Sequence, residues 1–169
     1  EILHKTEVGG VVLNVFSRNE VEQQYDAILS KVHSLMPQAR ILGMLMQNMV
    51  PQGKEVIIGA IRDTQFGPLI MFGLGGIYVN FLRDVSYRLC SLTRSEAREM
   101  IEETKAYTLL RGVRGEPPSD IDSVIEVILR VSQVMSRFKD IIEMEINPLF
   151  VYEEGKGCTA VDIRMTISK

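Results

Sequence analysis

Glu143-Met-Glu-Ile-Asn147 is the stretch of the 169-residue sequence that decides the fold, because it predicts a strand whose two faces differ. Polar residues alternate with apolar ones, so Glu143, Glu145 and Asn147 share one face of the strand. The same alternation returns in Val161-Asp-Ile-Arg-Met-Thr-Ile167, which predicts a second strand. Together the two segments predict an antiparallel hairpin with one polar face.

The register of this hairpin follows from the pattern. A turn centred on 154–155 pairs Asn147 with Asp162 and Glu145 with Arg164, and it brings both polar sets to the same face. A slip of one residue would set polar side chains against apolar ones, so the alternation selects the register. A proline follows Asn147, and a proline inside a paired strand indicates a bulge or a sheet edge.

The polar face has two interpretations. The carboxylates of Glu145 and Asp162 and the carboxamide oxygen of Asn147 are the hard oxygen ligands that suit Mg²⁺. The alternative is a solvated sheet face held by cross-strand pairs such as Glu145 with Arg164. On the pattern alone the solvated face is the commoner case, because outward polar residues are the norm in antiparallel sheets.

The rest of the chain predicts an α+β (α/β) fold, with a mixed, mostly antiparallel sheet and helices packed on it. Capping boxes at Ser17 and Thr93 each predict the start of a helix, and a Gly/Pro-rich link over 112–119 leads to a third. The predicted strands span 11–16, 40–50, 55–62, 68–72, 77–82, 85–89, 141–151 and 158–167.

Composition excludes several classes of protein. Apolar residues make up 46% and charged residues 24%, and the net charge of −3 gives no basic footprint for nucleic acid. The longest apolar stretch, 68–79, is short of the roughly 20 residues that span a bilayer. Cys90 and Cys158 lack metal-ligand spacing, which favours reduced thiols. We therefore expect a cytoplasmic protein with no nucleic-acid and no membrane partner.

Glu145-Ile-Asn-Pro-Leu149 resembles the Glu-x-Asn signature of ATP-grasp enzymes. Followed by a hairpin and an aspartate, it is similar to the β subunits of succinyl-CoA synthetase and of ADP-forming acyl-CoA synthetases. The resemblance implies that Asn147 and Asp162 hold Mg²⁺ against ATP or ADP. It also implies that Glu145 has a catalytic place close to the site that handles a phosphohistidine.

A second segment, His4-Lys-Thr-Glu-Val-Gly-Gly-Val11, resembles the His-Lys segment of acetate–CoA ligase β subunits. This resemblance implies that His4 carries the phosphoryl group transiently, a role that suits imidazole. The cations of Lys5, Arg62 and Arg88 are candidates to meet phosphate oxygens. The alternatives are a polar loop residue for His4 and surface or ion-pairing residues for the three cations.

The stretch from Gln47 to Glu55 resembles the hinge that receives adenine and ribose in this family. It implies that Glu55 lies on the ribose side and that the adenine is lined by Gln47, Asn48, Met49 and Val50.

Two departures from the family pattern bear on these expectations. Asn80 stands where the family usually has Glu, and the family's phosphate-contacting lysine lies upstream of the His-Lys segment and is absent. We therefore expect residues 1–169 to be the larger, C-terminal part of an ATP-grasp domain whose N-terminal piece is missing.

The resemblance implies one half of a two-part enzyme. That enzyme converts acyl-CoA, ADP and phosphate to a carboxylate, CoA and ATP, and its partner is a CoA-binding α subunit or domain, in an α2β2 assembly or a fused chain. Alternatives within the fold are a succinate-specific synthetase and the ATP-grasp domain of a protein acetyltransferase. Outside enzymes, the alternative is a regulatory nucleotide-binding module.

Overall fold

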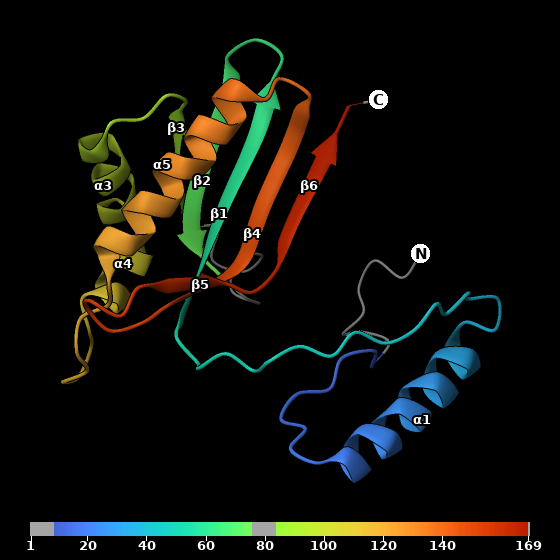
Figure 1. Cartoon of the computed structure of the whole chain (residues 1–169). Coiled ribbons are helices and arrows are strands. Elements are labelled where there is room, and N and C mark those ends of the chain that lie inside the picture. The colour runs from blue at the N-terminus through green and yellow to red at the C-terminus, as the bar shows by residue number, and fades with distance from the viewer. Residues whose placement is uncertain (1–8, 76–83, 169) are drawn as a thin grey trace. The chain divides into compact units, whose positions relative to one another are not determined.

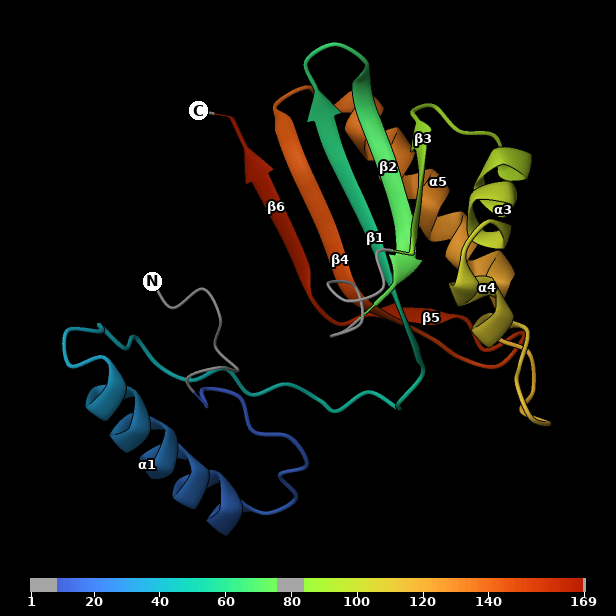
Figure 2. The ribbon, with the colours of Figure 1, turned by 180° about the vertical axis from the view of Figure 1, so that it is seen from behind.

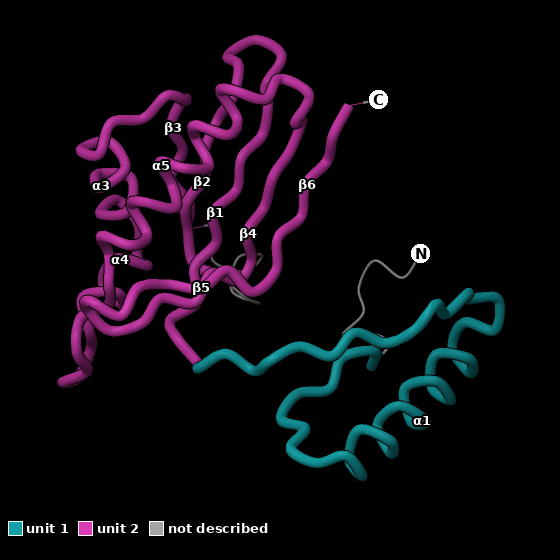
Figure 3. Tube along the Cα trace, viewed as in Figure 1, with its two compact units in different colours: residues 1–51 teal, residues 52–169 magenta. Residues whose placement is uncertain are grey.

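The computed structural model describes residues 9–75 and 84–168, which fall into two compact units, 1–51 and 52–169 (Figure 3). In this described part, no helix is long and apolar enough to cross a membrane. The predicted strand 77–82 lies outside the described residues.

Unit 1 contains one described helix, α1 (Arg18–Leu35), which begins at its predicted cap. The Ser17 side chain accepts a hydrogen bond from the backbone N–H of Glu20 at 3.2 Å. The Glu20 carboxylate in turn accepts from the backbone N–H of Phe16 at 2.8 Å. Side-chain acceptors at these positions satisfy N–H groups that have no partner within the helix, which explains why the helix starts here.

The strands predicted at 11–16 and 40–50 are wrong for this structure. Neither segment forms a ladder with any described residue. Within the first, Asn14 has a φ of 59°, which breaks an extended run. The second carries the apolar side chains that the pattern requires, yet Leu42 and Leu45 are 85% and 83% exposed. An apolar, extended segment becomes a strand only when a neighbouring strand accepts its hydrogen bonds.

Unit 2 is built on a sheet in which every named pairing is antiparallel. The strand order is β3-β2-β1-β4-β5, and β6 also pairs with β4 (Figure 1). The strands are β1 (Lys54–Asp63), β2 (Gly67–Leu74), β3 (Val85–Leu89), β4 (Ile141–Val151), β5 (Cys158–Ala160) and β6 (Ile163–Ile167).

Helices α3 (Arg94–Glu102), α4 (Lys105–Leu110) and α5 (Ile121–Arg137) cover one face of this sheet, and within the described residues of unit 2 no helix lies on the other face (Figures 1 and 2). The core lies between the two layers. Ile58, Phe72 and Ile128, from β1, β2 and α5, are all fully buried there. We call the opposite side the helix-free face, and it is the side on which the candidate site lies.

The central position of β1 explains its composition. Val56, Ile57 and Ile58 are all buried, as the prediction of a strand apolar on both faces requires. The predicted helices at Thr93 and after residue 119 are also present as α3 and α5, and α3 has its capping box.

The sequence analysis missed α4. This helix has only six residues and begins without a side-chain cap of its own. Asp84, 21 positions earlier, supplies the acceptor: its carboxylate accepts from the backbone N–H groups of Lys105 at 2.6 Å and Ala106 at 3.3 Å. A cap from so far along the chain leaves no local signal.

The hairpin has the predicted register. Glu145 lies opposite Arg164 in the β4–β6 ladder, and the backbone N–H of Asn147 donates to the carbonyl oxygen of Asp162 at 3.0 Å. The second strand is divided, because β5 ends at Ala160 and β6 begins at Ile163. The prediction of one continuous strand over 158–167 was therefore wrong.

Candidate functional site

The candidate metal centre lies on the helix-free face of β4. Ile146 is 4% exposed and belongs to the core cluster on the helix side. Its neighbour Glu145 points the opposite way because successive side chains of a strand alternate. In the ladder with β1, Glu145 lies opposite Gly59. The polar face predicted from the sequence is thus the face opposite α3, α4 and α5.

A bulge shapes the strand at this point. On β1 the register shifts between Val56, opposite Leu149, and Ile58, opposite Ile146. Asn147 and Pro148 together occupy the place of one residue opposite β1. The next side chain of β4 to enter the core after Ile146 is therefore that of Leu149, which is 1% exposed. The bulge predicted from the proline is confirmed, and bulges commonly redirect side chains beside functional sites.

Hydrogen bonds bring the candidate ligands together. The Asn147 side-chain Nδ2 donates to Glu145 Oε1 at 3.2 Å, which places both side chains on the same face. The backbone bond from Asn147 to Asp162 is continued by a second, in which the N–H of Val161 donates to the carbonyl of Pro148 at 3.0 Å. Asp162 therefore stands directly opposite Asn147, in the gap between β5 and β6.

The donor set fits magnesium better than a softer metal. The candidate ligand atoms of Asn147, Glu145 and Asp162 are all oxygens, and Mg²⁺ prefers oxygen, usually keeping waters and substrate phosphates in its shell. Within residues 9–75 and 84–168, no group of three or more His, Cys, Asp or Glu side chains could hold a metal. A protein cage of the zinc type is therefore absent from the described part, whereas a shared, phosphate-bridging Mg²⁺ needs only these few ligands.

Comparison with known proteins identifies the architecture. The model of the ATP-grasp domain matches residues 1–167. This chain belongs to the ATP-grasp family.

Among its relatives is the ADP-forming acetate–CoA ligase I of Archaeoglobus fulgidus, 50% identical over 169 residues, which are 100% of this chain and 24% of that protein. The β subunit of the ADP-forming acetate–CoA ligase II of Pyrococcus furiosus is 44% identical over 168 residues, 99% of this chain and 71% of that subunit. The chain thus spans about a quarter of the first relative and most of the second.

A solved structure has the same fold. It is the dinucleotide-forming acetyl-coenzyme A synthetase 1 of Ca. Korarchaeum cryptofilum in complex with coenzyme A and Mg-AMPPCP. Its TM-score is 0.86 at 39% identity, and the match covers 99% of this chain and 72% of that chain. In that structure, the phosphohistidine segment points towards the nucleotide binding site.

Among the other candidate residues of this ATP-grasp domain, Glu55 shares the helix-free face. It precedes Val56, whose side chain is in the core, and it lies opposite Phe150. Its side chain is exposed. The register therefore places Glu55 on the same face of the sheet as Glu145, but near the start of β1 rather than beside its middle.

The predicted adenine-lining residues belong to unit 1, so the structure does not test whether they meet the sheet. Gln47, Asn48 and Met49 are exposed and Val50 is partly buried, in a segment without secondary structure. His4 and Lys5 lie outside the described residues. The roles of all these residues stay predictions.

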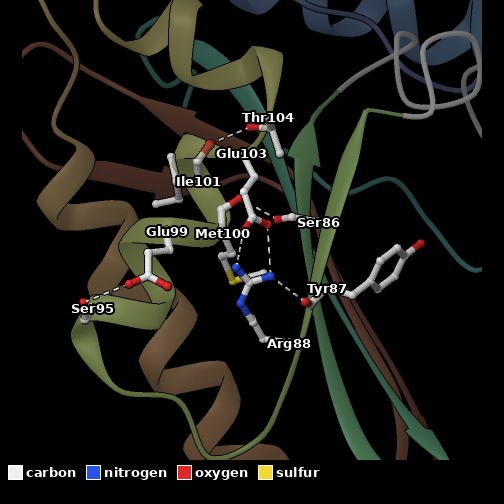
Figure 4. Close-up of polar contacts among 9 residues, drawn as sticks. All are labelled: Ser86, Tyr87, Arg88, Ser95, Glu99, Met100, Ile101, Glu103 and Thr104. Atoms are coloured by element: carbon white, nitrogen blue, oxygen red, sulfur yellow. Dashed lines mark hydrogen bonds and ion pairs between the residues drawn. The ribbon is translucent and has the colours of Figure 1, made fainter.

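Arg88 lies on the other side of the sheet from Glu145. Its ladder partner is Ile70, which belongs to the core on the helix-covered face. In Figure 4 its guanidinium points towards Glu103 at the end of α3, with contacts of 3.0 Å from Nη1 to Oε2 and 2.5 Å from Nη2 to Oε1. These hydrogen bonds lower the pKa of the Glu103 carboxyl and raise that of Arg88. The structure does not bring Arg88 together with the hairpin side chains, and it shows the ion pair that was the alternative.

Gly59 is a residue of this face that the sequence analysis missed. It occupies the middle of β1 beside Glu145, and a Cβ built on it would approach Met71 Cε at 3.1 Å. A glycine inside an apolar strand is itself a signal of close approach, and it could have been recognised from the sequence.

Proposed function

We propose that this chain is the nucleotide- and Mg²⁺-binding part of an ADP-forming acyl-CoA ligase. The reaction is acyl-CoA + ADP + phosphate ⇌ carboxylate + CoA + ATP. The observation that carries the proposal is the hydrogen bond between the side chains of Asn147 and Glu145 on the helix-free face of β4, with Asp162 opposite Asn147 across the hairpin. The family relationship supports the reaction, since the matched relatives are ligases of this type.

Phosphoryl transfer requires positioning and charge neutralisation more than covalent chemistry from the protein. Asn147 and Asp162 would hold Mg²⁺, which supplies the charge that neutralises the phosphate oxygens. Asn147 stands in the bulge of β4, and its backbone N–H bond to the carbonyl oxygen of Asp162 ties the two residues together across the hairpin.

The remaining residues complete the proposed site from outside the hairpin. Glu55 would contact the ribose, and the stretch from Gln47 to Val50 would line the adenine. His4 would carry the phosphoryl group, because a neutral imidazole is a nucleophile and its protonated form is a good leaving group. Lys5 would screen the phosphate charge.

A partner completes the proposed enzyme. The Pyrococcus furiosus relative is a β subunit, whereas the Archaeoglobus fulgidus relative is a longer chain. We propose that the acyl group and CoA are bound by an α subunit or domain, either as a separate chain in an α2β2 assembly or within one fused chain. A mobile phosphohistidine would deliver the phosphoryl group from that part to this site.

The test is formation of ADP by the full-length protein with its α partner, Mg²⁺-ATP, CoA and acetate, each omitted in turn. Asp162→Ala should lower the rate by roughly a hundredfold or more, because a bound metal contributes several kcal/mol of charge stabilisation. Asp140→Ala is the matched control: it removes an exposed aspartate from the turn before β4, and the rate should be unchanged.

Two outcomes would contradict the proposal. The absence of turnover with any small carboxylate, in a folded complex that binds Mg²⁺-ADP, would favour a regulatory module. Equal rates for Asp162→Ala and the control would remove Asp162 from the metal site.

A further inference from the structure

The hydrogen bond between Asn147 and Glu145 has a consequence for metal binding. Asn147 Nδ2 donates to Glu145 Oε1 at 3.2 Å, and both side chains are partly buried on one face of β4. Because Nδ2 faces the carboxylate, the amide oxygen Oδ1 lies on the other side of Cγ. The contact therefore selects one of the two orientations of the amide.

This selection matters because the two ends of a carboxamide differ. Only the oxygen can bind a cation, whereas the NH₂ group has two donors and repels one. The terminal torsion of asparagine is broad and roughly two-fold, so backbone position alone does not fix which end faces a ligand. Some other group has to hold the amide, and the carboxylate of Glu145 accepts a hydrogen bond from it.

The strand geometry allows Glu145 to reach along β4. The residue opposite it on β1 is Gly59, which has no side chain. Asn147 lies two residues further along, in the bulge that it forms with Pro148. Its backbone N–H donates to the carbonyl oxygen of Asp162, which holds its backbone in place. The backbone bond sets where Asn147 stands, and Glu145 sets how its amide is turned.

We propose that Glu145 is a positioning residue for Asn147, which turns the amide so that Oδ1 rather than Nδ2 faces Mg²⁺. The inference rests on the proposed function for its metal, but the orientation of the amide does not depend on that function. It differs from a role for Glu145 as a metal ligand or as a group at the phosphohistidine. A carboxylate that orients a ligand in this way is a common outer-shell device in metal sites.

The first arm of the test needs no metal. Full-length protein labelled with ¹⁵N-asparagine gives side-chain NH₂ signals, and the pair from Asn147 is identified by its loss in Asn147→Asp. In Glu145→Ala these signals should move upfield and their hydrogens should exchange faster, because a charge-assisted bond is lost. Glu143→Ala is the matched control, since it removes the same charge from the same face of β4 and leaves Asn147 its acceptor. Unchanged Asn147 signals in Glu145→Ala would overturn the proposal.

The second arm measures affinity for Mn²⁺ in the presence of ADP, by calorimetry or by the electron spin resonance of the free ion. Glu145→Ala should weaken Mn²⁺ binding by roughly tenfold or more, the usual cost of losing an outer-shell partner. Glu145→Gln should keep most of the affinity, because its Oε1 accepts the same bond. If Glu145→Gln binds Mn²⁺ as weakly as Glu145→Ala does, Glu145 acts through its charge as a metal ligand, and the positioning role is wrong.

A compensating change sharpens this arm. Within Glu145→Ala, the further change Asn147→Asp should raise the Mn²⁺ affinity again, because either oxygen of a carboxylate can bind the ion and no orientation is needed. A further loss in the double variant would contradict the proposal. Failure of the wild-type protein to bind Mn²⁺-ADP would instead overturn the proposed function, while the amide signals would still decide the role of Glu145.

Discussion

At the scale of single residues, the face of the sheet on which a side chain lies decides what it can do. Glu145 and Arg88 are both charged residues of predicted strands, and both were expected in one site. The register places Glu145 opposite Gly59 on the helix-free face and Arg88 opposite Ile70 on the covered one. Alternation of side chains along a strand thus places Asn147 beside Glu145 on one face, and it places Arg88 beside α3 on the other.

Arg88 also gives a prediction on stability and pH. Its hydrogen bonds lower the pKa of Glu103 in the folded protein, so their contribution is present above the ordinary carboxyl pKa. The contribution is lost as pH falls through the lowered value. We expect Arg88→Gln to lower the Tm of the protein modestly at pH 7, and by less at pH 4 and below.

Thermal unfolding followed by circular dichroism across this pH range measures the effect. Glu103→Gln is the control, because it should remove the same pH dependence, and the double variant should be no worse than either single one. If Arg88→Gln lowers the Tm by the same amount at every pH, the stabilisation comes from packing of the side chain and not from the ion pair.

At the scale of elements, the ends of helices are held by side chains from distant parts of the chain. Asp84 caps the start of α4, and Arg62 of β1 binds the end of α5. The Arg62 guanidinium donates to the carbonyl oxygens of Met135 at 2.6 Å, Phe138 at 3.0 Å and Ile141 at 3.1 Å. These bonds join the end of α5 and the first residue of β4 to the end of the central strand β1.

The Arg62 contacts predict a clear loss of stability. Arg62→Met should lower the free energy of unfolding by about 2 kcal/mol, because hydrogen bonds from a charged donor contribute more than neutral ones and their acceptors are left unpaired. Urea unfolding provides the measurement. Arg62→Lys should recover part of the loss, since an ammonium reaches fewer of the three carbonyls than the forked guanidinium. Equal free energies of unfolding for Arg62→Met and Arg62→Lys would mean that the aliphatic part of the side chain, and not its hydrogen bonds, stabilises the protein.

At the scale of the whole molecule, the two units differ in how much they bury. Unit 2 has a continuous core between its sheet and helices, whereas Val32 is the buried hydrophobic residue that the described part of unit 1 provides. In unit 1 the segment 40–50 keeps most of its large apolar side chains exposed, and it forms no ladder with any described residue.

This difference predicts where the chain is cleaved. In limited proteolysis of the 169-residue chain, the first cuts should fall within 36–51, and a resistant piece should begin near Lys54, because exposed backbone with few hydrogen bonds opens at little cost. Mass spectrometry of the products locates the cuts. Within unit 2, β1 serves as the internal control, and cleavage there as early as within 36–51 would contradict the prediction.

The sequence by itself determined the helix caps at Ser17 and Thr93, the central buried strand and the register of the hairpin that carries Glu145, Asn147 and Asp162. These features follow from local chemistry: alternation with a period of two admits one register, and the cap residue of a capping box acts within three positions of itself. The tertiary structure alone decided the division of β5 from β6, the helix α4, the face taken by Arg88 and the failure of 11–16 and 40–50 to form strands. Each depends on a partner far along the chain, or on the lack of one among the described residues, and hydrogen bonds between distant segments leave no trace in a local pattern.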